Sequence, residues 1–135
     1  MQDFNQAIIE EFRANKGVVG GGFAGSPIVL LHTTGAKSDL ERVNPLVCLP
    51  SDEGVLYVFA SKGGAPTDPD WYHNLVAHPD VTVEYGEETF EATATTLPSD
   101  ERDRIYAEQA ERYPTFGEYQ EKAGRTIPVV ALRRH

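Results

Sequence analysis

Polar and cationic side chains gather in one stretch of the sequence, residues 33–74, at points where short apolar runs end in loops. Lys37 and Ser38 stand in the loop after the first run, and Arg42 opens the second run. A Gly-rich loop at residues 61–64 follows the third run, and we expect its successive backbone N–H groups to be free. Backbone amides, hydroxyls and cations at strand ends are what a phosphorylated ligand requires. The pattern therefore predicts an anion site.

The segment after this loop adds groups suited to a flat ring. Trp71 and Tyr72 supply aromatic faces, and Asn74 supplies an amide for the edge of a heterocycle. Small-ligand sites combine apolar walls with a few polar groups in this way. A purely structural interpretation is equally open, in which the glycines of the loop only make a turn and Trp71 fills the core.

The distribution of charge supports the anion site. The chain carries 12 Lys+Arg and 21 Asp+Glu, for a net charge of -9. A domain this acidic repels a phosphate backbone, so we expect no nucleic-acid partner. Most of the surplus acid lies in residues 65–135, where it makes a solvated face. Residues 17–64 hold three bases, Lys37, Arg42 and Lys62, which stand in or beside Gly-rich loops. They are candidate anion ligands on an otherwise acidic protein.

The hydrophobic pattern predicts a mostly β domain that positions these groups. Apolar or alternating runs indicate six short strands, at residues 28–33, 42–49, 55–60, 81–85, 89–97 and 127–132. Amphipathic or capped stretches indicate helices at residues 3–15, 70–77, 99–113 and 114–122, with Ser99 as an N-cap. This order indicates an α+β fold, mainly β, with a small barrel or strongly curled sheet and helices at its ends and flanks.

Several common chemistries have no support in the sequence. A single cysteine, Cys48, excludes an internal disulfide framework and a multi-cysteine metal site. His73 and His78 do not share a face of their short helix, so we expect no metal centre. The G-x-G-x-x-G pattern at residues 20–25 follows a helix and leads into a strand, which is the reverse of a dinucleotide-binding unit.

The length of 135 residues and a hydrophobic content of 40% predict one domain, residues 1–135. The first residues carry acids where a signal peptide is basic, and no apolar run approaches membrane-spanning length. We therefore expect a cytoplasmic protein without stable membrane insertion.

Six short motifs stand between residues 33 and 129. They are Thr33-Thr-Gly-x-Lys-Ser38, Arg42-Val-x-Pro45, Ala60-Ser-Lys-Gly-Gly-Ala-Pro66, Pro69-x-Trp-Tyr-His-Asn74, Pro79-x-Val81 and Arg125-Thr-Ile-Pro-Val129. In combination they resemble the deazaflavin (coenzyme F420)-dependent nitroreductase and quinone reductase family, of the actinobacterial split-barrel type. Its phosphate loop usually reads Gly-Arg-Lys-Ser-Gly, whereas residues 35–39 here read Gly-Ala-Lys-Ser-Asp. The loss of a guanidinium and the gain of an acid predict weaker binding of an anionic tail.

The resemblance implies a six-stranded split β-barrel, FMN-binding-like in fold, with flanking helices. It implies coenzyme F420, a deazaflavin with a phosphate-linked polyglutamate tail, as cofactor. The implied reaction is hydride transfer from the reduced deazaflavin to a small electron-poor acceptor, namely a quinone, an activated enone or lactone, or a nitroaromatic. Family barrels commonly pair, so a homodimer is expected. Two alternatives remain open: an FMN-binding oxidoreductase on the same barrel, and a non-catalytic F420 carrier or storage protein.

The resemblance also extends to individual residues. The positions that match cofactor-binding ones are Lys37, Ser38, Arg42, Val43, Asn44, Pro45, Ala60, Ser61, Lys62, Gly63, Gly64, Trp71, Tyr72 and Asn74. Tyr113, Phe116 and Tyr119 match the face where the family places substrate, and either phenol or water is the candidate proton donor. Phe116 stands where some members carry a third tyrosine. We therefore expect quinone-like or enone acceptors to be reduced faster than bicyclic nitroimidazoles.

Overall fold

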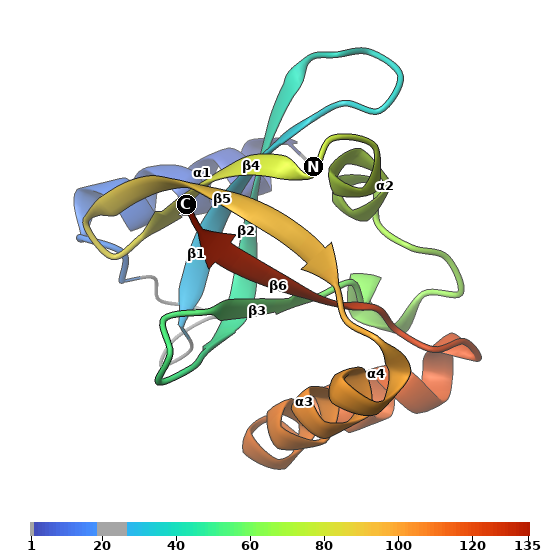
Figure 1. The fold of residues 1–135 in the computed structure, drawn as a ribbon. Helices are drawn as coiled ribbons and strands as arrows, with labels where there is room; N and C mark the ends of the chain where they lie inside the picture. The colour runs from blue at the N-terminus through green and yellow to red at the C-terminus, as the bar shows by residue number, and fades with distance from the viewer. Residues whose placement is uncertain (1, 19–26) are drawn as a thin grey trace.

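The protein folds around one closed barrel of six antiparallel strands (Figure 1). The structure is a computed structural model, and it describes residues 2–18 and 27–135; the glycine pattern at residues 20–25 lies outside them. The strands are β1 (Ile28–Thr34), β2 (Glu41–Pro50), β3 (Leu56–Phe59), β4 (Asp80–Tyr85), β5 (Glu88–Thr96) and β6 (Val129–Arg134). They follow the order β1-β2-β3-β6-β5-β4 around the barrel. All six predicted strands are present, and β6 begins two residues later than expected.

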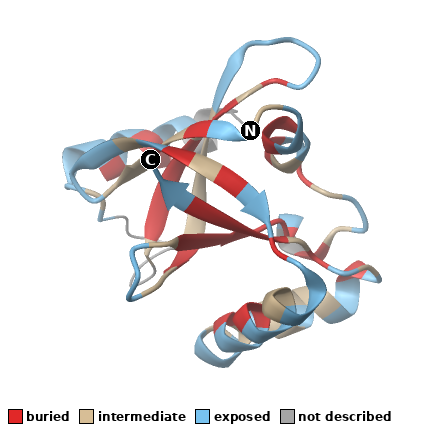
Figure 2. Cartoon of the chain, viewed as in Figure 1, coloured by how far each residue is buried: buried red, intermediate tan, exposed pale blue. Residues whose placement is uncertain are grey.

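The continuous apolar runs of β1 and β3 reflect burial on both faces of these strands. In β1, Val29 and Leu31 point into the barrel core, while Ile28 and Leu30 belong to a separate cluster outside it. In β3, Leu56 and Val58 lie in the barrel core, and the alternate residues pack in a third cluster. Figure 2 shows the buried residues concentrated along the strands and on the inward faces of the helices.

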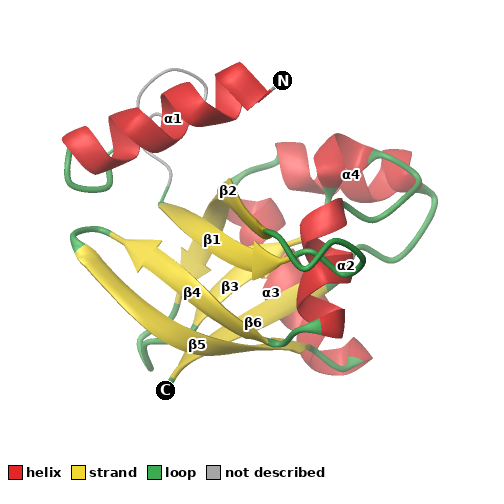
Figure 3. Ribbon diagram, turned by 90° about the horizontal axis from the view of Figure 1, so that it is seen from above, coloured by secondary structure: helices red, strands yellow, loops and turns green. Residues whose placement is uncertain are grey.

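Four helices cover the outside and one end of the barrel (Figures 1 and 3). Helix α1 (Gln2–Ala14) packs Ile8, Ile9 and Phe12 on β1 and β2. Helices α3 (Ser99–Arg112) and α4 (Thr115–Ala123) lie together over β3 and β6, and α2 (Asp70–Ala77) contacts β1 and β5. A short 3-10 helix, η2 (Lys62–Gly64), follows β3 and contacts α4. Within the described residues, no helix has the length and apolar character needed to span a bilayer.

Helix α3 corrects one sequence expectation. Ser99 was expected to cap this helix, but it is the first helical residue, and Pro98 occupies the cap position without a side-chain hydrogen bond. The ring of Pro98 holds φ at -67°, and its carbonyl accepts the N–H of Arg102 at 2.8 Å. A proline in this conformation therefore starts the helix without a hydroxyl cap.

The barrel is closed, but its seam between β2 and β3 is open over residues 41–47 of β2. Residues 41–47 of β2 pair with β1, whereas β3 pairs only with Cys48, Leu49 and Pro50. In the described chain, no strand pairs with the other edge of residues 41–47. This edge leaves backbone N–H and C=O groups available to a ligand. The seam is where the polar residues of the sequence meet.

Candidate functional site

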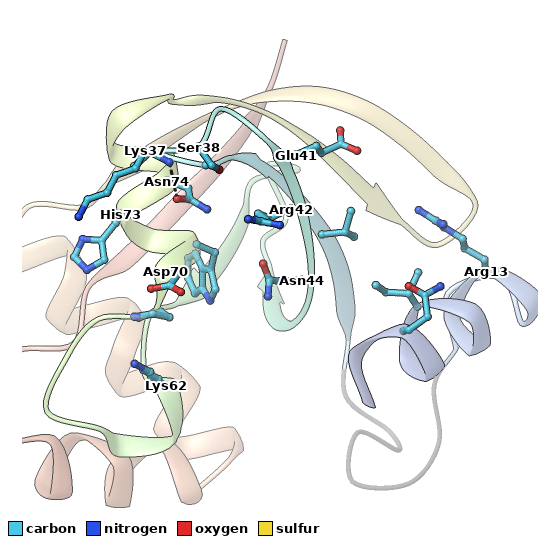
Figure 4. Close-up of a pocket in the computed structure, with 17 residues that line it drawn as sticks. Arg13, Lys37, Ser38, Glu41, Arg42, Asn44, Lys62, Asp70, His73 and Asn74 are labelled. Carbon is cyan, nitrogen blue, oxygen red and sulfur yellow. Dashed lines mark hydrogen bonds between the residues drawn. The ribbon is translucent and has the colours of Figure 1, made fainter. Parts of the chain in front are cut away.

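A cleft of about 1150 Å³ lies along this seam (Figure 4). Its walls come from α1, the loop between β1 and β2, the first half of β2, Lys62 and the start of α2. The residues of the predicted cofactor site that line it are Lys37, Ser38, Arg42, Val43, Asn44, Lys62, Trp71 and Asn74. These residues are up to 37 positions apart in sequence, and the fold brings them to one place.

Three cations from three different elements face the cleft. Lys37 and Lys62 lie on the α2 side, and Arg42 points into the cleft from β2 (Figure 4). None of the three forms a salt bridge with a carboxylate in the part of the chain that the structure describes. Asp70 and Glu41 also line the cleft, so the cations exceed the acids there. On a protein of net charge -9, this local surplus favours an anionic ligand.

The α1 end of the cleft has a different charge balance. Arg13 of α1 donates two hydrogen bonds to Glu84 of β4, from Nε at 3.1 Å and from Nη2 at 2.6 Å. His32 Nε2 lies 2.6 Å from the same carboxylate. The hydrogen bond from Arg13 outweighs burial and lowers the pKa of Glu84 below its ordinary value. The Arg13 charge is thereby neutralised, and the unpaired positive charge lies with Lys37, Arg42 and Lys62.

Asn74 holds the loop between β1 and β2. Its Oδ1 accepts the N–H of Ala36 at 2.9 Å, and its Nδ2 donates to Thr33 Oγ1 at 3.2 Å. Its side chain is buried, with 8% of the residue exposed. The amide oxygen therefore holds the loop, and one N–H of the amide nitrogen holds the end of β1. These bonds give Asn74 a supporting role for the loop that carries Lys37, while its side chain also lines the cleft.

The loop at residues 61–64 is more ordered than expected. Residues 62–64 form η2, in which Gly64 N–H donates to Ser61 O at 2.9 Å. The expectation of successive free N–H groups is therefore wrong at Gly64. Its φ is +87°, and an added Cβ would lie 3.3 Å from the Cα of Tyr119. Glycine at this position allows η2 to approach α4 closely.

Other predicted cofactor residues lie next to the cleft but do not line it. They are Pro45, Ala60, Ser61, Gly63, Gly64 and Tyr72. The Tyr72 hydroxyl is directed to β5, where it lies 3.2 Å from Thr96 Oγ1. Trp71 lines the cleft, and with 6% of the residue exposed it also packs in the barrel core. Its position is therefore compatible with contact to a ligand and with a role in the core.

The predicted substrate face, Tyr113, Phe116 and Tyr119, lies at the start of α4 and on it, outside the cleft lining. Phe116 makes edge-to-face contacts with Phe59, Tyr113 and Tyr119, with ring centroids 5.5, 6.5 and 5.3 Å away. These residues form an aromatic wall on and beside α4, the helix that packs against η2, and η2 carries Lys62. The structure therefore places the aromatic wall next to the helix that packs on residues 62–64, and not in the cleft itself.

The thiol of Cys48 can be assigned a chemical state. Burial raises the pKa of the Cys48 thiol to about 12, so Cys48 is a neutral core residue. Among the described residues, no group of three or more His, Cys, Asp or Glu side chains is arranged to hold a metal ion. Arg125 begins the last of the six motifs, and its side chain reaches residues 60–68. Only the fold reveals this contact, because it joins positions about 60 residues apart.

The structure is thus a small six-stranded antiparallel barrel whose cation-lined seam is suited to an anionic ligand. A family model described as F420H(2)-dependent quinone reductase matches residues 6–134. A protein of Mycobacterium tuberculosis (strain H37Rv), named an F420H(2)-dependent quinone reductase, is 40% identical over 130 residues, covering 91% of this chain and 85% of the relative. The chain therefore belongs to the F420H(2)-dependent quinone reductase family.

Two solved structures share this fold. A structure described as F420-H2 dependent reductase (FDR-A) is 42% identical, with a TM-score of 0.72, over 79% of this chain and 94% of that chain. A second, described as a domain-swapped dimer, is 37% identical, with a TM-score of 0.73, over 98% of this chain and 96% of that one. The resemblance and the split-barrel fold class predicted from the sequence are both confirmed.

Proposed function

We propose that this protein is an F420H2-dependent oxidoreductase that transfers a hydride to an electron-poor acceptor, with a quinone as the favoured class. Residues 1–135 act as a single F420-binding domain. The observation that carries the proposal is a set of three cations, Lys37, Arg42 and Lys62, on one seam of an acidic protein; none of them has a carboxylate partner among the described residues. The family's name and the relatives' names agree with this chemistry.

The residues of the cleft fit coenzyme F420. Lys37, Ser38, Arg42 and Lys62 supply the donors and positive charge that a phosphate and a polyglutamate tail require. Val43, Asn44 and Trp71 supply the apolar and amide surface for the ring, and the free edge of β2 supplies backbone groups. When bound, the reduced deazaflavin supplies the hydride from a carbon atom; the chain binds, orients and shields the reactants.

The other predicted cofactor residues adjoin the residues that line the cleft and support them. Pro45 continues the free edge of β2, and Ala60, Ser61, Gly63 and Gly64 form the loop that presents Lys62. Tyr72 and Asn74 belong to the same helix as Trp71. We assign these residues to cofactor binding because they hold the groups that line the cleft in their positions.

A turnover assay with a simple naphthoquinone tests the reaction. We expect oxidation of F420H2 that depends on both enzyme and quinone. Full activity with NADH and FMN instead would favour the FMN alternative. Binding of F420 without turnover on any quinone, enone or nitroaromatic would favour a carrier protein.

Phe116→Tyr tests the aromatic wall as the acceptor surface. Stacking on the wall favours flat apolar acceptors, and a new hydroxyl there gives a partner to acceptors that need a hydrogen bond or a proton. We expect the substitution to raise nitroimidazole turnover relative to quinone turnover, with Tyr113 and Tyr119 as the phenols that the wild type already offers. The measurement is the ratio of the two kcat/KM values. An unchanged ratio would mean that Phe116 only packs against Phe59 and its neighbours.

We also propose that the protein is a homodimer, with a small-molecule hydride acceptor as its other partner. The relative described as a domain-swapped dimer supports pairing, since it matches nearly the whole chain. A chain of this length buries a modest core, which pairing would enlarge. Light scattering at assay concentration is expected to report about twice the chain mass of 14.9 kDa. A mass equal to one chain would refute the dimer.

A further inference from the structure

Arg125 makes an unusual set of contacts for a residue outside the cleft. It lies between α4 and β6, and only 17% of its side chain is exposed. Its guanidinium donates to four acceptors in one segment, residues 60–68. They are the carbonyl oxygens of Ala60 at 3.1 Å, Ala65 at 3.2 Å and Thr67 at 2.9 Å, and Asp68 Oδ1 at 2.6 Å.

The segment that Arg125 binds contains Lys62, whose backbone is strained. Lys62 has a φ of +48°, in the left-handed region that residues with a side chain rarely adopt. Such a conformation persists only where the surrounding structure enforces it. Arg125 binds the chain on both sides of Lys62, at Ala60 and at Ala65. The guanidinium therefore fixes the two ends of the turn that aims Lys62 into the cleft.

Arg125 also controls the charge around Lys62. Asp68 is the acid within the same segment, and Arg125 pairs with it at 2.6 Å, with 27% of the Asp68 side chain exposed. Lys62 Nζ has a single described hydrogen bond, to Thr67 Oγ1 at 3.4 Å, and the carbonyl of Thr67 is held by Arg125. Because the Asp68 carboxylate is paired with Arg125, it does not neutralise the ammonium of Lys62. The charge of Lys62 therefore remains available to a ligand.

We infer that Arg125 is a positioning residue for the anion site: it shapes residues 60–68 and keeps Asp68 from neutralising Lys62. The inference rests on the proposed function, because the ligand of Lys62 is taken to be F420. A lysine cannot replace this arginine, since an ammonium lacks the planar fork that serves several acceptors in fixed directions.

Arg125→Lys tests this role, with Arg102→Lys as the matched control. The Arg102 guanidinium is similarly buried, and it binds the backbone carbonyl of Ile127, the carboxylate of Asp103 and the side chain of Gln120. Gln120 also donates to the backbone carbonyl of Arg125, so Arg102→Lys perturbs the backbone support of Arg125 and leaves the guanidinium contacts of Arg125 in place. Arg102 has no described contact with residues 60–68. We expect Arg125→Lys to weaken F420 binding about tenfold or more, whereas Arg102→Lys changes the Kd by less than about threefold at a comparable loss of Tm.

A double-mutant cycle separates positioning from general destabilisation. In a Lys62→Ala background, Arg125→Lys should weaken F420 binding by less than about threefold, because the group it positions is gone. Asp68→Asn retains the three carbonyl bonds of Arg125, and it serves as the milder variant if Arg125→Lys does not fold. It should weaken F420 binding by less than about tenfold relative to the wild type, and this loss should disappear in the Lys62→Ala background; an equal loss with and without Lys62 would overturn the inference.

Hydrogen exchange of the ligand-free protein gives a readout that does not depend on the cofactor. Arg125→Lys should speed exchange at the amides of residues 61–68, and Arg102→Lys should not. Unchanged exchange there, or equal effects of Arg125→Lys on F420 binding with and without Lys62, would overturn this inference alone. A wild type that fails to bind F420 would overturn the proposed function, and this inference with it.

Discussion

Lys62→Ala is expected to weaken F420 binding by about ten- to a hundredfold and to leave the Tm nearly unchanged. A charge-assisted hydrogen bond contributes about 1.5–3 kcal/mol, which gives this range of Kd. Lys62 is exposed, and its ammonium has one described contact within the protein, at 3.4 Å. Removing it therefore costs the fold little. Fluorescence titration with F420 and a thermal melt measure the two quantities.

Lys16→Ala is the matched control for Lys62→Ala. Lys16 is an exposed lysine with a φ of +58°, so the substitution removes the same charge from a similar backbone conformation, away from the cleft. We expect its Kd for F420 to equal that of the wild type. An unchanged Kd for Lys62→Ala together with a collapsed Tm would show that Lys62 is structural.

Asn74→Ala is expected to reduce both stability and cofactor affinity. It leaves the N–H of Ala36 and the hydroxyl of Thr33 without their partner, and Thr33 is buried. Each lost bond to a buried polar group costs about 1–3 kcal/mol, so the Tm should fall by several degrees. The loop that carries Lys37 and Ser38 then loses its anchor, and F420 binding weakens as a consequence.

Asn44→Ala separates these two effects. Asn44 also lines the cleft with an amide, and none of the described hydrogen bonds of the chain involves its side chain. We expect it to change the Kd for F420 while the Tm stays close to that of the wild type. If Asn74→Ala melts at the wild-type temperature, the loop does not depend on Asn74.

The strands were predictable because their signals are local. Residues 28–33 and 55–60 are short apolar runs bounded by turn residues, and both became strands covered on two faces. The cap of α3 was misassigned because Pro98 and Ser99 both favour a helix start. The open seam had no local signal, since it arises from the short pairing of β3 with residues 48–50.

The site residues also divide into those that a local sequence pattern predicts and those whose contacts join positions far apart in the sequence. The cations Lys37, Arg42 and Lys62 could be found from strand ends and loops, and all three line the cleft. The supporting role of Asn74 could not be predicted, because nothing in the sequence links it to Thr33, 41 positions away. The four contacts of Arg125 span 57 to 65 positions, which only the closed barrel brings together.

Parallel titration of the pure protein with F420 and with FMN tests the central claim most directly. The account predicts saturable binding of F420, weakened by added salt because Lys37, Arg42 and Lys62 recognise negative charge. It predicts much weaker binding of FMN, which lacks the polyglutamate tail. Tight binding of FMN with no measurable binding of F420 would contradict the account.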